Sequence, residues 1–370
     1  MPPLPNPLGL SFEELTSRVR ELGLPAFRAQ QVFRAIHRER AATWDAIQVL
    51  SPQVRQTLTT AFDLRWPEVA ERVQAADGTV RYLLRLADGE MIESVFIPVE
   101  DFEGGGETVR NRYTFCISTQ VGCPVNCQFC LTALLGLKRN LEAAEIVGQV
   151  LTLLREHGLQ AGVSGGDRVN VVYMGMGEPF LNYENVMRSV TVLTTPKGAA
   201  LSPRRITIST SGVVDKIRRY AGEPIRPNLA ISLNATTDES RTALMPLNRG
   251  QGGLAALFQA ARDYPLGGRE YLTFEYVLLA GVNDSPEDAQ RILELTRGIA
   301  CKVNLIAWNM GPNLPFASPS EEQVQAFQQV LIRGGLGAWV RRPRGREIYA
   351  ACGQLKKTVT EGALPVLASL

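Results

Sequence analysis

Hydrophobic and polar residues follow two different periods along the chain, and the period changes near residue 67. Before it, apolar residues recur three to four positions apart, as in Phe12, Leu15 and Val19, behind a capping pair of Ser11 and Glu14. This spacing predicts helices that begin at residue 11 and continue over 26–39, 43–50 and 52–62. Residues 1–66 are therefore expected to form a small helical accessory domain behind a proline-rich start.

The next segment, 67–110, has the pattern of paired strands. Asp77-Gly78 and Asp88-Gly89 are turn dipeptides, and they bracket strand-like runs over 79–86 and 90–98. We expect a β-hairpin extension here, ending in a flexible, glycine-rich linker.

From residue 111 short apolar runs alternate with helical patterns, which predicts parallel strands joined by crossover helices. The expected strands are 113–118, 170–175, 205–209, 229–234, 272–279 and 302–308. The expected helices are 142–157, 184–194, 213–221, 238–245, 253–263, 286–298 and 320–334. Six such units favour an α/β fold, a partial (β/α)6 barrel over 111–356, with a C-terminal tail at 357–370. In such barrels, site residues gather at the carboxyl ends of the strands.

Composition adds few constraints to this picture. The 370 residues are 45% hydrophobic and 21% charged with a net charge of +2, as in an ordinary globular protein, so charge alone does not indicate nucleic-acid binding. The N-terminus has no signal-peptide pattern, and no apolar run approaches the ~18 residues of a membrane span, so we expect a cytoplasmic protein without membrane contact. With only two histidines, a histidine-built metal site or a hydrolase triad is disfavoured.

The strongest chemical signal is a loop that follows the first barrel strand. Cys123, Cys127 and Cys130 have C-x3-C-x2-C spacing. A four-iron cluster normally takes four thiolates, so three would leave one iron open for chemistry. A structural zinc site with Cys116 as the fourth thiolate is the alternative, although zinc sites more often use two C-x2-4-C pairs.

Polar residues also follow the later strands, where they would surround one mouth of the barrel. Glycines after the second strand would let a ligand approach the backbone, and Glu178 there is placed to pair with a cationic amino group. Each residue alone is typical of a turn or a helix cap, and only together do they indicate a binding site. The candidates at the strand ends are Gly177, Glu178, Ser209, Ser232, Leu233, Asn234 and Asn309.

Three further features have both a structural and a functional interpretation. Glu93, within MIESVFIP, is an outward-facing strand residue or, if it faces inward, a candidate base. Cys352 is a buried, inert thiol or a reactive one near the barrel mouth. The arginines of RRPRGR form a solvated patch or contact phosphate. They are Arg341, Arg342, Arg344 and Arg346.

Several motifs together resemble the RlmN/Cfr family of radical S-adenosylmethionine (SAM) RNA adenosine methyltransferases. They are CISTQVGCPVNCQFC, GMGEPFLN, ITISTSGVV, LAISLNATTDESR, KVNLIAWN and AACGQL, and the similarity covers about 12–356. AACGQL together with MIESVFIP and Cys116 indicates this family among the radical SAM enzymes, and the full helical domain with AACGQL near the end favours its RlmN side. The resemblance implies C2 methylation of adenosine in 23S rRNA at the peptidyl-transferase centre and in tRNA next to the anticodon. C8 methylation, as in the Cfr branch, and a zinc-stabilised RNA-binding protein without catalysis are the alternatives.

The resemblance also implies roles for individual residues. A [4Fe-4S] cluster would bind Cys123, Cys127 and Cys130, and two SAM molecules would be used per turnover. Cys352 would carry the methyl group, Glu93 would remove the C2 proton, and Cys116 would release the product by forming a disulfide with Cys352. The family's SAM contacts map onto the strand-end candidates named above.

The expected partners are 23S rRNA, tRNA and an external electron donor such as a flavodoxin or ferredoxin system, and we expect a monomer. The chain departs from the family pattern at Asn234, where histidine is common, at Pro343, at Arg346-Glu347 and in the loop after Asn309.

Overall fold

The computed structural model describes residues 4–101, 110–162, 166–268, 270–311 and 314–355. A ten-stranded sheet is its central feature, with the strand order β1-β2-β3-β4-β7-β8-β9-β10-β11-β12. The expected tail at 357–370 and most of the expected linker lie outside the described residues. No helix in the described ranges is both long and apolar enough to cross a membrane.

The first four strands pair in an antiparallel manner, and the remaining pairings, from β4 to β12, are parallel. The antiparallel strands are β1 (Glu68–Gln74), β2 (Val80–Arg85), β3 (Met91–Asp101) and β4 (Arg110–Cys116). The parallel strands that follow are β7 (Arg168–Tyr173), β8 (Ile206–Thr210), β9 (Asn228–Ser232), β10 (Leu272–Leu278), β11 (Cys301–Ala307) and β12 (Gly337–Val340). The hairpin extension and the barrel therefore share one sheet.

The expected α/β barrel is confirmed, and each of its six predicted strands is present. Sequence reasoning missed two edge strands, β1 and the short β12. β1 is largely exposed, so it lacks the apolar alternation that marks a half-buried strand. β12 has only four residues, and its exposed Trp339 and Val340 give no clear period.

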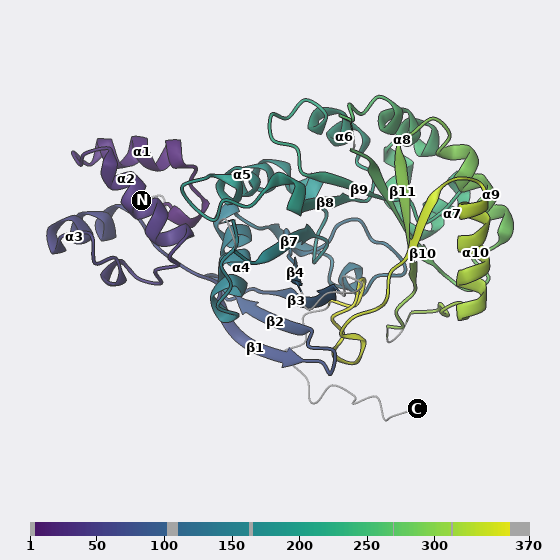
Figure 1. The fold of residues 1–370 in the computed structure, drawn as a ribbon, viewed down its shortest axis with the longest axis horizontal. Coiled ribbons are helices and arrows are strands. Elements are labelled where there is room, and N and C mark those ends of the chain that lie inside the picture. The colour runs from purple at the N-terminus through teal and green to yellow at the C-terminus, as the bar shows by residue number, and fades with distance from the viewer. Residues whose placement is uncertain (1–3, 102–109, 163–165, 269, 312–313, 356–370) are drawn as a thin grey trace.

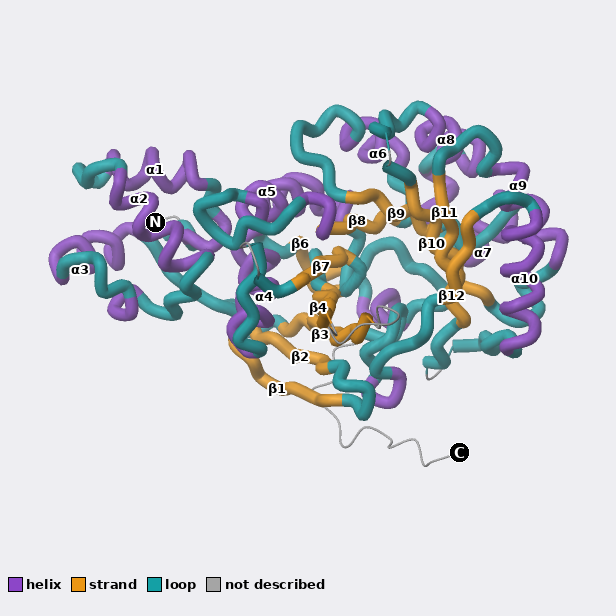
Figure 2. The backbone as a smooth tube through the Cα atoms, viewed as in Figure 1, coloured by secondary structure: helices purple, strands orange, loops and turns teal. Residues whose placement is uncertain are grey.

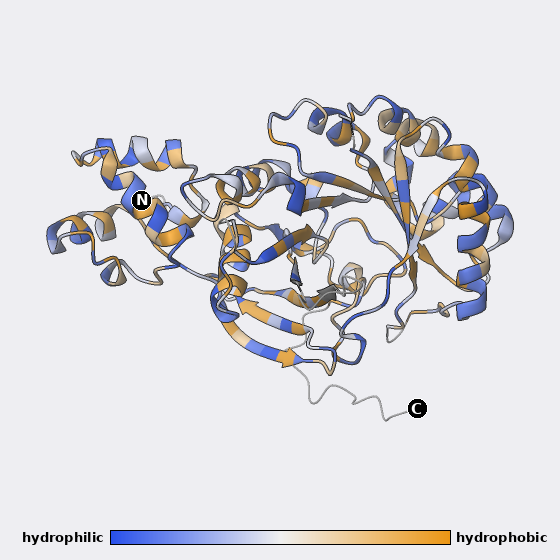
Figure 3. Cartoon of the chain, in the orientation of Figure 1, coloured by the Kyte–Doolittle hydropathy of each residue, from blue (hydrophilic) through white to orange (hydrophobic). Residues whose placement is uncertain are grey.

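Helices cover the outer face of the curved sheet, as Figure 1 and Figure 2 show. They are α4 (Ala143–Glu156), α5 (Tyr183–Thr194), α6 (Val214–Tyr220), α7 (Asp238–Leu244), α8 (Gly253–Arg262), α9 (Pro286–Leu295) and α10 (Glu321–Arg333). Along α9 and α10, apolar and polar residues alternate in stripes (Figure 3), so one face packs on the strands and the other meets solvent.

The N-terminal helices lie beside α4 and α5, apart from the barrel mouth (Figure 1). They are α1 (Phe12–Glu21), α2 (Phe27–His37) and α3 (Pro52–Ala61), and the capping box of Ser11 and Glu14 is present. The helix expected over 43–50 is wrong, since only a 3-10 turn forms at Trp44–Ala46. The residue before a proline disfavours the helical conformation, and Ser51, which precedes Pro52, is extended. A helix that began near residue 43 would therefore have to end before Ser51 and could not join α3.

Candidate active site

The three-cysteine loop leaves the sheet after β4 and is closed at its base by a two-stranded ribbon. The ribbon pairs β5 (Gln120–Gly122) with β6 (Leu137–Asn140). Gly122 has a φ of +79°, and a Cβ on it would lie 1.7 Å from the Gly136 carbonyl oxygen. The ribbon therefore requires glycine at this position, and the pairing of β5 with β6 holds the two ends of the loop close together.

The far side of the loop packs against an apolar shell. Phe129 is buried with Leu244, Met245 and Trp308, and the Trp308 indole N–H donates to the Phe129 carbonyl at 2.9 Å. The Leu131 amide donates to the Gly353 carbonyl at 2.8 Å, which ties the loop to the C-terminal segment. The aromatic residue before the third cysteine thus fixes the loop against the end of β11.

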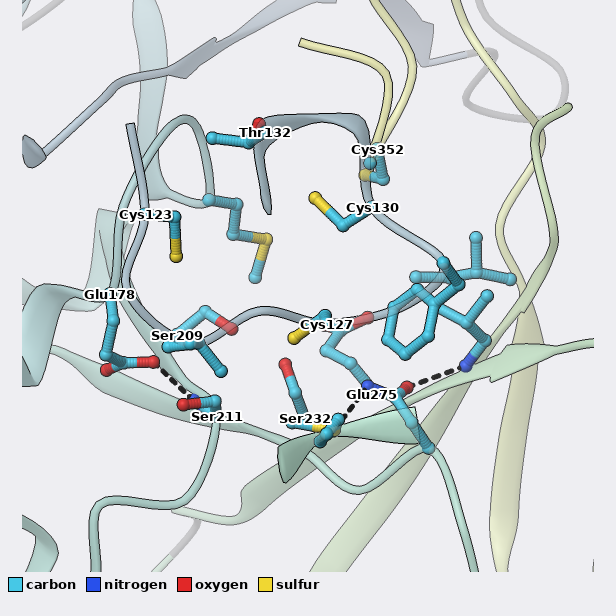
Figure 4. A pocket seen from close by; sticks show the side chains of 18 of the residues that line it. Cys123, Cys127, Cys130, Thr132, Glu178, Ser209, Ser211, Ser232, Glu275 and Cys352 are labelled. Atoms are coloured by element: carbon cyan, nitrogen blue, oxygen red, sulfur yellow. Dashed lines mark hydrogen bonds between the residues drawn. The ribbon is translucent and has the colours of Figure 1, made fainter. Parts of the chain in front are cut away.

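All three cysteines of the loop line one cavity at the carboxyl ends of the strands. In Figure 4, Cys123, Cys127 and Cys130 lie around this cavity, with Cys352 next to Cys130. Burial raises the pKa of the Cys123 thiol to about 12 and also raises the pKa values of Cys127 and Cys130. The thiols would therefore become thiolates at neutral pH only by binding a cationic partner.

These thiols fit an iron–sulfur cluster better than a single metal ion. Among the described residues, no three His, Cys, Asp or Glu side chains converge closely enough to hold one ion. Cys116, the fourth ligand in the zinc interpretation, lines a neighbouring hollow and does not line the cavity of the three cysteines. A cluster takes one thiolate per iron, so its ligands stay apart as they do here.

The turn after β7 forms the cavity wall beside Cys123. Gly177 has a φ of +103°, and a Cβ there would lie 2.8 Å from the Gln120 amide nitrogen, so the close approach requires glycine. Both carboxylate oxygens of Glu178 accept backbone hydrogen bonds, from Ser211 at 2.6 Å and from Phe180 at 2.9 Å. Burial raises the pKa of Glu178, and these two bonds oppose that rise.

The strand-end candidates separate into residues that line the cavity and residues that support it. Ser209, Ser232, Asn234 and Asn309 line the cavity, whereas Leu233 is fully buried and is not part of the lining. Asn309 donates to the Cys352 carbonyl at 3.3 Å, and within the described ranges its own side-chain oxygen has no partner.

Asn234, where the resemblance leads us to expect a histidine, is held by the neighbouring strand. Its side-chain oxygen accepts from the Val277 amide at 2.9 Å, and its amide group contacts the Met245 sulfur at 3.3 Å. With a φ of +57°, it adopts the left-handed conformation that asparagine tolerates better than most residues.

A second hollow joins the cavity and brings Cys116 and Cys352 together. Both thiols are free and line this hollow, Cys116 at the end of β4 and Cys352 from the C-terminal segment. Cys352 also lines the first cavity, so it belongs to the walls of both hollows. Burial raises the pKa of the Cys352 thiol, and the adjacent Arg341 guanidinium opposes this rise.

Glu93 faces inward but lies outside the residues that line either hollow. It is 1% exposed and forms an ion pair of 3.0 Å with Arg81, which is 4% exposed. The outward-facing interpretation is therefore wrong. The Glu93 side chain lies on the same face of β3 as Ile97 and Val99, which line the second hollow. The Ser118 hydroxyl donates to the backbone carbonyl of Glu93 at 2.6 Å.

Two of the four arginines in the C-terminal run make contacts within the protein. A guanidinium nitrogen of Arg341 lies 3.4 Å from a carboxylate oxygen of Glu275 at the cavity. A guanidinium nitrogen of Arg344 lies 3.9 Å from a carboxylate oxygen of Asp77. A fully solvated patch is therefore wrong for these two side chains.

Sequence reasoning also missed two buried charged residues. Arg241, 1% exposed, donates to the carbonyls of Ser211 at 2.7 Å, Ser232 at 3.2 Å and Leu233 at 3.2 Å. Glu275 lines the cavity from β10 at 5% exposure. A charged residue inside an apolar strand, as in LTFEYVL, was the only signal for Glu275.

The fold and the site define the class of protein. A parallel α/β barrel with a three-cysteine loop after its first strand and a glycine-rich turn after its second characterises the radical SAM enzymes. The model of the radical SAM superfamily matches residues 117–295. A second model, the ribosomal RNA large subunit methyltransferase N-terminal domain, matches residues 5–64.

Individual relatives narrow the class to one family. A probable dual-specificity RNA methyltransferase RlmN from Koribacter versatilis is 47% identical over 92% of this chain and 98% of its own. The RlmN enzyme of Syntrophus aciditrophicus is 44% identical over 96% and 97%. A crystal structure of a radical SAM methyltransferase from Sphaerobacter thermophilus superposes with a TM-score of 0.86 at 42% identity, covering 95% of this chain and 99% of that one. The chain belongs to the RlmN family.

Proposed function

We propose that this protein methylates C2 of adenosine in RNA, with 23S rRNA and tRNA as substrates. The observation that carries the proposal is the position of Cys352, which faces both the cavity of the three cysteines and the hollow of Cys116. A sulfur that lies between a radical source and a second thiol suits a methyl carrier, because the second thiol can later release the methylated product from that sulfur. The relatives' names, dual-specificity RNA methyltransferase, support RNA as the substrate.

The three cysteines of the loop would hold a [4Fe-4S] cluster, and the cavity lining would hold SAM. When bound, the cluster and SAM supply the radical chemistry that activates a methyl group on the Cys352 sulfur. The Glu178 region would receive the amino group of SAM. Because both Glu178 oxygens already accept one backbone bond each, the ammonium would use a remaining lone pair.

Cys352 would first take a methyl group from one SAM molecule. The thiol loses its proton, a sulfur–carbon bond forms, and S-adenosylhomocysteine leaves. The adjacent Arg341 favours the thiolate that this step requires. A second SAM is then needed for the radical step, so two SAM molecules are used for each methylated base.

Joining the methyl carbon to C2 would cost the methyl group one hydrogen atom and the adduct one electron, both taken up by the radical chemistry that bound SAM and the cluster would supply. Glu93 and Cys116 would then complete the reaction. Glu93 would accept the C2 proton, and the pairing with Arg81 would stabilise the carboxylate until it is needed. Burial raises the pKa of the Cys116 thiol, so its proton would leave as the sulfur attacks the Cys352 sulfur and would become available to the departing carbon. A disulfide forms as the sulfur–carbon bond breaks, and the carbon keeps the electron pair and takes a proton to become the C2 methyl group.

The RNA and the electron donor must approach from outside the barrel. The target adenosine would leave its stack to reach Cys352, at a cost of a few kcal/mol. The helical accessory domain is our candidate for RNA contact, together with Arg342 and Arg346 of the C-terminal run. A flavodoxin or ferredoxin system would supply electrons to the cluster.

Product analysis tests the proposal directly. Anaerobically reconstituted protein is incubated with SAM, a reductant and either 23S rRNA or tRNA, and nucleosides are identified by mass spectrometry. We expect 2-methyladenosine. If 8-methyladenosine were the sole product, the C2 assignment would be wrong, and stoichiometric zinc without iron or sulfide would overturn the radical chemistry.

Two cysteine substitutions test the proposed roles. Cys352→Ala should abolish turnover, whereas Cys116→Ala should leave the protein covalently attached to its RNA. Sequencing the trapped RNA would identify the substrate. Cys301→Ala is the matched control, because Cys301 is a partly buried thiol on β11 that lies outside both hollows. Normal turnover by Cys116→Ala would contradict the release step.

A further inference from the structure

Glu275 presents an unpartnered carboxylate oxygen at the cavity. The residue is 5% exposed, and Oε2 has no hydrogen-bond partner among the described residues. The other oxygen, Oε1, accepts from the Asn304 amide at 2.9 Å and lies 3.4 Å from an Arg341 nitrogen. A buried carboxylate oxygen left without a donor is costly, so this arrangement points to a ligand that supplies one.

The sheet register directs this carboxylate into the barrel. Glu275 is paired with Ser232 on β9 and with Asn304 on β11. Neighbouring residues of parallel strands point to the same face, so the three side chains form one polar layer inside the barrel. Ser232 and Glu275 both line the cavity of the three cysteines. Asn304 orients the carboxylate through the hydrogen bond that its side-chain amide donates to Oε1.

The charges around Glu275 restrict the chemistry of its ligand. Arg341 already balances the negative charge, so a second cation such as the amino group or the sulfonium of SAM would lie close to a guanidinium. A neutral donor avoids that repulsion. A hydroxyl of a ribose is such a donor, and carboxylates hold ribose hydroxyls in the same way in dinucleotide-binding folds.

We infer that Glu275 is a further binding residue of this site, and that its Oε2 accepts a hydrogen bond from a ribose hydroxyl of the SAM nucleoside. The inference rests on the proposed function, because it assumes that SAM occupies the cavity. It adds a residue of β10 to the contacts that the strand ends provide. It also gives Arg341 a second role, since this arginine joins Glu275 to the segment that carries Cys352.

Binding measurements without turnover test the inference. Cluster-loaded full-length protein is titrated anaerobically with S-adenosylhomocysteine and with its 2′-deoxy and 3′-deoxy analogues. Glu275→Gln should weaken S-adenosylhomocysteine binding by about tenfold or more, the usual effect of losing a hydrogen bond to a charged group. Its effect on the analogue that lacks the bonded hydroxyl should be several-fold smaller. Glu287→Gln, on the exposed start of α9, is the matched control and should change neither affinity.

The possible results separate this inference from the proposed function. If wild-type protein failed to bind S-adenosylhomocysteine, the proposed function would fail and this inference with it. If wild-type protein bound it and Glu275→Gln bound it equally well, only the inference would fail, and Oε2 would hold no more than a water. If Glu275→Gln weakened the binding of all three ligands equally, the inference would also be overturned. It would be overturned as well if the variant lost affinity for RNA alone, because the bonded hydroxyl would then belong to the RNA.

Discussion

Beside the three-cysteine loop, two walls of the cavity are built in different ways. One wall consists of the carboxyl ends of β7 to β11, where backbone pairing fixes the strand residues, and of the turns that follow them, which carry Gly177, Asn234 and Asn309. The other is the C-terminal segment 341–355, which carries Cys352 and has no helix or strand longer than a 3-10 turn among its described residues. The first wall is held in place by the hydrogen bonds of the sheet, whereas the second is held by individual side-chain and backbone contacts outside the sheet.

The contacts of the C-terminal segment are spread over several parts of the chain. The Gly345 amide donates to Asp77 at 3.1 Å, and Glu347 accepts from the Ala76 amide at 3.0 Å. Near Cys352, the Thr132 hydroxyl donates to the Leu355 carbonyl at 2.7 Å. Because these contacts are separate from the sheet pairing, we expect the segment to open without unfolding the barrel, although Ile348, Ala350 and Leu355 pack in the main core. Under the proposed function, Cys352 would meet SAM, RNA and Cys116 in turn, and that sequence would require the segment to open.

The largest expected effect follows from removing a thiol of the loop. Cys123→Ala should reduce iron and sulfide from about four of each per chain to nearly none after anaerobic reconstitution, because a cluster held by two thiolates is poorly retained. Chemical iron and sulfide analysis measures this. Cys301→Ala should keep the full content. A Cys123→Ala protein that retained its iron would show that the cluster is held elsewhere.

The strand-built wall should be sensitive to the loss of Arg241. Arg241→Met leaves three buried carbonyls without their donor, and we expect a loss of about 3 kcal/mol in unfolding free energy. Burial lowers the pKa of Arg241 to about 10, so the side chain stays charged at neutral pH. Thermal unfolding of the metal-free protein, followed by circular dichroism, should show a decrease of several degrees.

Arg218→Met provides the matched control for this change. Arg218 is exposed on α6 and forms only a surface contact of 3.5 Å with Asp215, so its loss should change stability by less than about 0.5 kcal/mol. Equal melting temperatures for the two variants would show that Arg241 does not hold the strand ends together.

The difference between the walls also explains what the sequence could predict. The six inner strands have periodic apolar runs, and the cysteine spacing is local, so both were found. Arg241 and Glu275 were missed because their roles depend on contacts between residues on separate strands and helices. The partners of Arg341 and Arg344 were missed for the same reason: Asp77 lies more than 260 residues away from Arg344 in the chain. Short-range patterns carry no information about such pairs.

The smallest expected effect concerns the attachment of the C-terminal segment to the hairpin. Asp77→Asn removes the charge that faces Arg344 and weakens the bond from the Gly345 amide. We expect a loss of about 1 kcal/mol, which corresponds to a roughly fivefold increase in the detached population. Cys352 should then react faster with iodoacetamide by a similar factor, measured by peptide mass spectrometry.

Asp88→Asn is the control that isolates this attachment. Asp88 occupies the other Asp-Gly turn of the hairpin, accepts the same kind of turn bond at 3.0 Å, and pairs with Arg139 instead of the C-terminal segment. It should leave the alkylation rate of Cys352 unchanged. Equal rates for Asp77→Asn and wild type would show that the hairpin does not restrain the segment.

The pH of this measurement follows from the pKa of Asp77. Burial raises that pKa, but the hydrogen bonds from Thr79 and Gly345 and the charge of Arg344 outweigh burial and lower it. Because the folded pKa lies below the unfolded value of about 3.9, the contribution to stability is complete above that value and is lost only as the pH falls through the folded pKa. The attachment should therefore be intact throughout the range from pH 6 to about 8, where thiol alkylation is measured. A difference between Asp77→Asn and wild type that disappeared within this range would mean that another group, and not Asp77, controls the segment.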